Sequence, residues 1–159
     1  MKLRIIATLL LFLGLIAGKA ANSGTFIDRG AFYAAISSEN IATINAQLNT
    51  LQALAGSEKD AFEGALLMKK AGLVSKTKEK MSFFKAGRTK LENAINKDND
   101  NAEFRFLRIL IQENAPKIVN YRDDIDTDAA FVKSNYKALP SSVQQVIADY
   151  SKKSKALKL

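Results

Sequence analysis

The sequence contains no cysteine, no histidine and no tryptophan, and only two of its 159 residues are proline. Without thiols and imidazoles, the chain lacks the residues for a Cys or His zinc site, a Ser-His-Asp triad, a Cys-His nucleophile pair or a disulfide framework. The chemistry that remains uses carboxylates, lysine, tyrosine and oxygen-ligated metal ions. A chain of this length with 47% apolar residues predicts one globular domain.

The first segment of the chain has the composition of an export signal. Lys2 and Arg4 precede an apolar block over residues 5–17, and the small residues Gly18 and Ala20 follow it. A basic start, an apolar block of this length and small residues at its end are typical of a secretory signal peptide. We expect cleavage after Ala20. The alternative is an uncleaved anchor, although the block is shorter than the roughly 20 residues that a membrane-spanning helix needs.

Cleavage would change the charge balance of the chain. Residues 1–20 hold three of the 24 basic residues and no acidic one, so 21 basic and 16 acidic residues remain, with a net charge of +5. We expect residues 21–151 to form the folded domain and residues 152–159 to form a basic tail that frays. Because the folded body is then nearly neutral, we expect no nucleic-acid partner. The expected location is the periplasm or the medium, with no membrane span after cleavage.

Apolar residues recur at spacings of three and four along most of the chain, which predicts amphipathic helices. No convincing strand pattern or hairpin dipeptide is present. We therefore predict an all-α fold of about six or seven short helices with antiparallel neighbours, and the segment 26–36 is compatible with one further helical turn or two. The predicted helices cover residues 41–55, 57–72, 81–95, 101–113, 116–121, 127–136 and 141–150.

One predicted helix and one glycine indicate how the helices pack against each other. Six apolar residues between Phe104 and Ile111 cover nearly the whole circumference of one predicted helix, so we expect that helix to be central and buried. Gly87 lies inside another predicted helix, where glycine costs about 1 kcal/mol relative to alanine. Close packing of a neighbouring helix would explain a glycine there.

Small, large apolar and acidic residues also follow one another at defined offsets in the middle of the chain. They are Gly64 and Leu67 in one predicted helix and Gly87, Leu91, Ala94 and Asp98 in the next. This pattern resembles the two helices of a tetratricopeptide repeat, and the resemblance covers about residues 58–113. Asn99 departs from it, because the family prefers proline there. The resemblance implies a scaffold that holds partner peptides in a concave groove.

A second resemblance concerns the run from Glu103 to Gln112. This run is similar to a segment of exported helical proteins of Gram-negative bacteria. The similarity implies an exported helical protein and carries no activity with it.

Arg105, Arg108 and Gln112 form one polar stripe on the helix that is otherwise apolar. Two guanidinium groups and an amide on one face could clamp a carboxylate or phosphate of a ligand. Alternatively, the stripe pairs inside the protein with an acidic residue, because an unpaired buried arginine is costly. The candidates for such pairing are Asp123, Asp124, Asp126 and Glu92. These three stripe residues are the predicted binding site.

Two other groups of charged residues have simpler interpretations. Asp124, Asp126 and Asp128 alternate as in a calcium loop, but Ala129 stands where an EF-hand needs glycine and Asn135 where it needs glutamate. Helix capping explains these acids, so we predict no metal site. The lysines at 69–70 and 76–80 are interpreted as solvated faces. Binding to a membrane surface is the alternative, although no coherent basic amphipathic helix accompanies them.

The function that fits these observations is non-enzymatic binding. We predict an exported adaptor or scaffold of the bacterial cell envelope that binds an acidic or carboxylate-bearing protein partner and uses no cofactor. One alternative is a small-anion-binding protein, and another is an envelope hydrolase that uses a pair of carboxylates on a glycosidic bond. The carboxylates available to the hydrolase are Glu92, Glu103, Glu113 and Asp123.

Overall fold

The computed structural model describes residues 26–159, and the predicted signal peptide lies outside them. The described chain contains seven α-helices, three short 3-10 helices and no strand, so the predicted all-α class is confirmed. None of its helices combines the length and the apolar character needed to cross a bilayer. The α-helices are α1 (Arg29–Ser37), α2 (Ile41–Thr50), α3 (Gly56–Leu73), α4 (Thr77–Lys97), α5 (Ala102–Asn114), α6 (Ile125–Asn135) and α7 (Ser141–Ser151).

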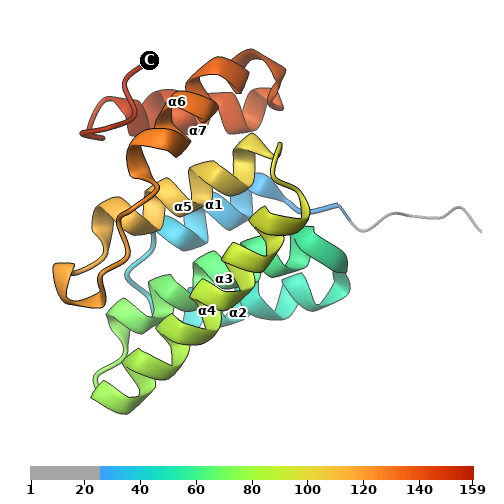
Figure 1. Ribbon diagram of the computed structural model, residues 1–159. Coiled ribbons are helices and arrows are strands. Elements are labelled where there is room, and N and C mark those ends of the chain that lie inside the picture. Colours follow the sequence, from blue (N-terminus) through green and yellow to red (C-terminus); the bar gives the residue numbers. More distant parts are fainter. Residues whose placement is uncertain (1–25) are drawn as a thin grey trace, which may run out of the picture.

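The helices form three tiers (Figure 1). The middle tier holds α1 and α5, the tier with α6 and α7 lies on one side, and the tier with α2, α3 and α4 lies on the other. The side chains of Phe106, Leu107 and Ile109 on α5 are completely buried. A helix enclosed by neighbours on several sides buries nearly its whole circumference, and the expectation of a central apolar helix is therefore confirmed.

The helices α3 and α4 form a long antiparallel hairpin whose backbones meet at two glycines. A Cβ atom built on Gly87 would lie 2.5 Å from the carbonyl oxygen of Gly64, and one built on Gly64 would lie 2.7 Å from the carbonyl oxygen of Gly87. Both distances are far shorter than any ordinary contact of a Cβ atom. The close approach expected at Gly87 is therefore present, and Gly64 supplies the other half of it.

Several helix ends differ from their predicted positions. The helix α4 begins at Thr77, so Lys78 and Lys80 belong to its first turn and not to a connector. The start of the predicted helix at residue 101 makes Asp100 its expected N-cap, but the N-cap of α5 is Asn101. Its side-chain oxygen accepts hydrogen bonds from two backbone amides of the first turn. The predicted helix at 116–121 is only a 3-10 turn, Lys117–Val119, which ends at Asn120 in the left-handed conformation with φ of 45°.

The C-terminal strap, residues 152–159, is packed against the domain, so the expectation that these residues fray is wrong. Leu157 is completely buried and Ser154 is 3% exposed, while the lysines between and around them point outward. One apolar side chain thus reaches the core, and the strap is also held through polar contacts with α5. A count of lysines could not reveal this, because the anchoring residues are the uncharged ones.

Candidate functional site

The predicted site residue Arg108 lies in a buried ion-pair network. Its Nε donates to Asp128 Oδ2 at 2.6 Å, and its second terminal nitrogen donates to Asp128 Oδ1 at 2.9 Å. Its remaining nitrogen donates to Glu92 Oε2 at 2.8 Å. Burial alone lowers the pKa of Arg108, but the hydrogen bonds and charges of Asp128 and Glu92 raise the pKa above its ordinary value.

The other two stripe residues join the same network. Arg105 donates to Asp128 Oδ1 at 2.9 Å and to the carbonyl oxygen of Asn99, and its guanidinium lies over the ring of Phe131. Gln112 donates to Asp124 Oδ2 at 3.1 Å, while its buried side-chain oxygen has no hydrogen-bond partner. The structure thus brings all three predicted residues together. Since protein carboxylates already occupy both guanidinium groups, this geometry favours internal pairing, and a role in partner binding stays a prediction.

The partners of the stripe were only partly predictable. Glu92 and Asp124 are among the four acids named from the sequence, whereas Asp123 and Asp126 are exposed. The principal partner, Asp128, was not among them. The available signal was its spacing of four from Asp124, which places both carboxylates on one face of α6.

The tyrosine in the connector between α5 and α6 extends the network to α4. The hydroxyl of Tyr121 donates to Glu92. The guanidinium of Arg88 lies 4.6 Å from the centre of the Tyr121 ring, and Phe84 packs edge-on against the ring with the centroids 5.9 Å apart. Burial and the neighbouring Glu92 carboxylate raise the pKa of Tyr121 well above its ordinary value. The connector is therefore fastened along α4.

Three of the four carboxylates considered for hydrolysis are engaged with protein donors. Glu103 is 4% exposed and accepts hydrogen bonds from Arg29 and Tyr33. Glu92 and Glu113 are engaged in the same way, and Asp123 is exposed. A general acid of a glycosidase needs a raised pKa and access to the substrate. The geometry of Glu103 points instead to a clamp between α5 and α1.

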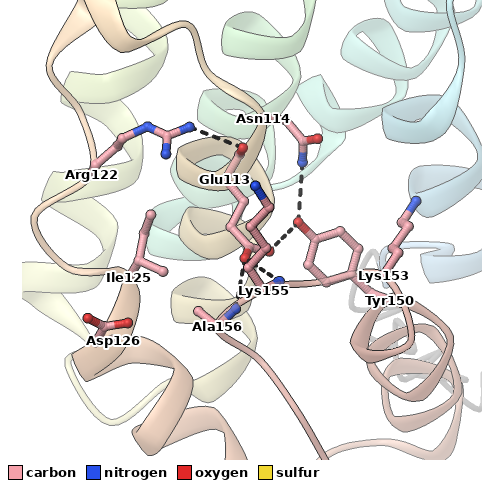
Figure 2. Close-up of a pocket in the computed structure, with 9 residues that line it drawn as sticks. All are labelled: Glu113, Asn114, Arg122, Ile125, Asp126, Tyr150, Lys153, Lys155 and Ala156. Atoms are coloured by element: carbon pink, nitrogen blue, oxygen red, sulfur yellow. Dashed lines mark hydrogen bonds between the residues drawn. The ribbon is translucent and has the colours of Figure 1, made fainter.

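A cavity of about 450 Å³ opens at the end of α5, between the α5–α6 connector and the strap (Figure 2). At its back, the carboxylate of Glu113 accepts hydrogen bonds from the hydroxyls of Tyr150 and Ser154, both at 2.7 Å. It also accepts from the backbone amides of Lys155 and Ala156 at 2.9 and 3.0 Å. The cavity is lined by Glu113, Asn114, Arg122, Ile125, Asp126, Tyr150, Lys153, Lys155 and Ala156.

These contacts make the strap sensitive to acid. Burial alone raises the pKa of Glu113, but the four hydrogen bonds outweigh it and hold the pKa below its ordinary value of 4.5. Because the folded-state pKa of Glu113 is lower than the unfolded-state pKa, its stabilisation of the strap is present above pH 4.5 and is lost as the pH falls through the folded-state pKa.

We expect the backbone amides of Lys155 and Ala156 to exchange about tenfold faster in Glu113→Gln than in the parent at neutral pH. The reason is that a hydrogen bond to a charged acceptor contributes about 1.5–3 kcal/mol to stability. Amide hydrogen exchange followed by NMR measures the change. Equal protection in both proteins would show that the carboxylate does not hold the strap.

A second hollow of about 240 Å³ continues the first along α6. The two hollows share Asp126 and Ala156, and we call them together the α6 groove. Five cations line it, and within residues 26–159 no carboxylate forms a salt bridge with any of them, since the ion pairs present lie elsewhere. They are Arg122, Lys133, Lys153, Lys155 and Lys158.

Comparison with known proteins assigns the chain to no family. No family model, no curated protein and no solved structure matches the chain. The resemblances to tetratricopeptide repeats and to exported helical proteins therefore stay predictions. The groove was missed at the level of sequence because its lysines come from two distant segments, one of which was expected to fray.

Proposed function

We propose that this protein is an exported, non-enzymatic adaptor that binds an acidic segment of a partner protein in the α6 groove. The observation that carries this proposal is the set of five cations around the groove, which come from the connector, α6 and the strap. Of the two carboxylates in the lining, Glu113 is already saturated by four protein donors, which leaves Asp126. A basic surface of this kind is complementary to an acidic partner.

The dimensions of the groove suit a short extended segment. From Ile125 to Lys133 the helix rises about 12 Å, at about 1.5 Å per residue. An extended peptide covers that length with about four residues. Ala129 and Ala156 are small lining residues, which allow a peptide backbone to approach closely. Arg122 uses one terminal nitrogen for two carbonyl oxygens at 3.3 Å, so the rest of its guanidinium can bind a partner carboxylate.

The test measures binding of a fluorescent peptide of alternating Glu and Asp residues by anisotropy. We expect the triple variant Lys133→Gln, Lys155→Gln, Lys158→Gln to bind it about tenfold more weakly at low salt, since exposed charge pairs contribute about 0.2–1 kcal/mol each. Binding by the parent should also weaken as salt is added. Because these lysines are exposed, the thermal midpoint of unfolding should not change.

The matched control is a peptide of the same length made of Gln and Asn. Equal affinity of the parent for both peptides would contradict the proposal, and so would unchanged affinity in the triple variant. The Arg105→Met, Arg108→Met protein serves as a second control. Loss of peptide binding in that variant with unchanged stability would show that the stripe of Arg105, Arg108 and Gln112 is the binding site.

A small anionic ligand is the second candidate occupant, because the first hollow has the size of a small-molecule site. Free glutamate distinguishes the two. If it displaces the acidic peptide at a comparable concentration per carboxylate, the groove recognises a small ligand. If displacement requires several linked acidic residues, the groove recognises a chain.

A further inference from the structure

The end of the α3–α4 hairpin carries an excess of positive charge. We call residues 70–85 the hairpin tip, which comprises the last turn of α3, the connection and the first turns of α4. It contains five lysines and a single acid, Glu79, which pairs with Lys76 at 3.3 Å. The other four lysines are Lys70, Lys78, Lys80 and Lys85. Among the described residues no carboxylate forms a salt bridge with any of them, and all of them except Lys70 are exposed.

The placement of these lysines works against the stability of the helix. The N-terminal end of an α-helix carries a partial positive charge, so anions stabilise it and cations destabilise it. Lys76, Lys78 and Lys80 surround the first turn of α4, a helix of 21 residues. The C-terminal end of α3 lies at the same tip and carries the opposite partial charge, so the excess positive potential there comes from the lysine side chains. An external anionic surface would neutralise it.

An exposed apolar side chain accompanies the charge. Met81 is 58% exposed and lies between Lys78 and Lys85 at spacings of three and four, so the three share one outward face of α4. Because α4 starts four residues before its predicted beginning, Lys78 belongs to the same helix as Met81 and Lys85, which the predicted start at residue 81 did not indicate.

We propose that the hairpin tip docks on an anionic phospholipid surface, with Met81 reaching between the headgroups and the lysines above them. Its lysines are flexible point charges spread around a projecting end of the molecule, as Figure 1 shows for the hairpin. Such charges on a projecting end suit a diffuse anionic surface, whereas the cations of the α6 groove line a hollow that can hold a chain. Met81 is a single exposed apolar anchor among these lysines, as on membrane-surface helices.

This inference is independent of the proposed function. Most of the residues that line the α6 groove belong to α6 and the strap. The helices α6 and α7 lie in one tier, and the hairpin lies in the tier on the other side of α1 and α5 (Figure 1).

The test is co-sedimentation of the chain purified from the exporting cell with vesicles of phosphatidylcholine that contain about one-third phosphatidylglycerol. We expect the variant Lys78→Gln, Lys80→Gln, Lys85→Gln to partition about a hundredfold less, at about fivefold per lysine. We expect Met81→Ser to reduce partitioning severalfold. The lysine variant should melt at the same temperature as the parent or higher, because all three lysines are exposed and two of them lie in the first turn of α4.

The groove variant Lys133→Gln, Lys155→Gln, Lys158→Gln is the matched control, since it loses the same charge elsewhere. It should bind vesicles within about twofold of the parent, and the hairpin variant should keep its affinity for the acidic peptide. All these proteins share one N-terminus, so the apolar block cannot cause a difference between them. Equal binding of the parent to pure phosphatidylcholine would overturn the proposal, as would equal losses in both triple variants. Loss of acidic-peptide binding in the hairpin variant, with vesicle binding unchanged, would instead indicate a protein partner at the tip.

Discussion

Arg108→Met is expected to lower the free energy of unfolding by about 3 kcal/mol, within the range of about 3–5 kcal/mol measured when one partner of a buried ion pair is removed. Asp128 is completely buried, and Arg108 supplies two of its three hydrogen bonds from guanidinium groups. Methionine fills a similar volume without neutralising the carboxylate. We place the effect at the lower end because Arg105 still contacts Asp128. Urea unfolding monitored by circular dichroism measures the change.

A double-mutant cycle separates lost packing from the stranded charge. In Arg108→Met, Asp128→Asn the carboxylate is gone, so most of the penalty should disappear and the two changes should be strongly non-additive. Arg105→Met is the milder control, because its side chain is 17% exposed and Arg108 continues to hold Asp128. If Arg108→Met has the same free energy of unfolding as the parent but no longer binds a partner protein, the stripe is a ligand-binding site, and the ion-pair network is the arrangement it adopts without ligand.

Gly87→Ala is expected to destabilise the protein by about 2 kcal/mol, although alanine is the better helix former by about 1 kcal/mol. The added methyl group would lie 2.5 Å from the carbonyl oxygen of Gly64 and 2.9 Å from the backbone nitrogen of Met68. Because the contacts on α3 include backbone atoms, a rotamer change cannot relieve them and the two helices must separate. The thermal midpoint measured by calorimetry should fall by several degrees for a domain of this size.

Gly72→Ala is the matched control for this prediction. Gly72 lies near the end of α3, and nothing stands within 4 Å of a Cβ atom built on it. The same chemical change should therefore leave stability unchanged or raise it by up to about 1 kcal/mol. Similar effects of the two substitutions would show that helix propensity, and not the close crossing, governs both positions.

The contrast between α5 and the strap shows what patterning could and could not predict. The buried character of α5 follows from apolar residues within 13 positions, which local periodicity displays directly. The strap is held by Glu113, whose bonds to Lys155 and Ala156 cross 42 and 43 residues of chain. Nothing in the local composition of a lysine-rich end indicates such an acceptor. The prediction of fraying was wrong for that reason.

The candidate sites divide in the same way. The stripe of Arg105, Arg108 and Gln112 was visible in the sequence, because residues three and four apart share a helix face. The sequence did not show which acidic residue pairs with the stripe, since that pairing depends on the angle at which α6 crosses α5. The choice of Asp128 over Asp126 follows from that angle, because two residues along a helix point about 200° apart. The groove beside α6 depends on the same packing.

The sequence by itself determined the all-α class, the central place of α5 and the close approach at Gly87. Each of these is a property of spacing within one segment or of a single residue that has no side chain. Only the tertiary structure decided which residues pair with the stripe, how the strap packs on the domain, and that a basic groove forms beside α6. Those features arise where distant segments meet, and the free energy that selects the pairing belongs to the assembled packing and not to any one helix.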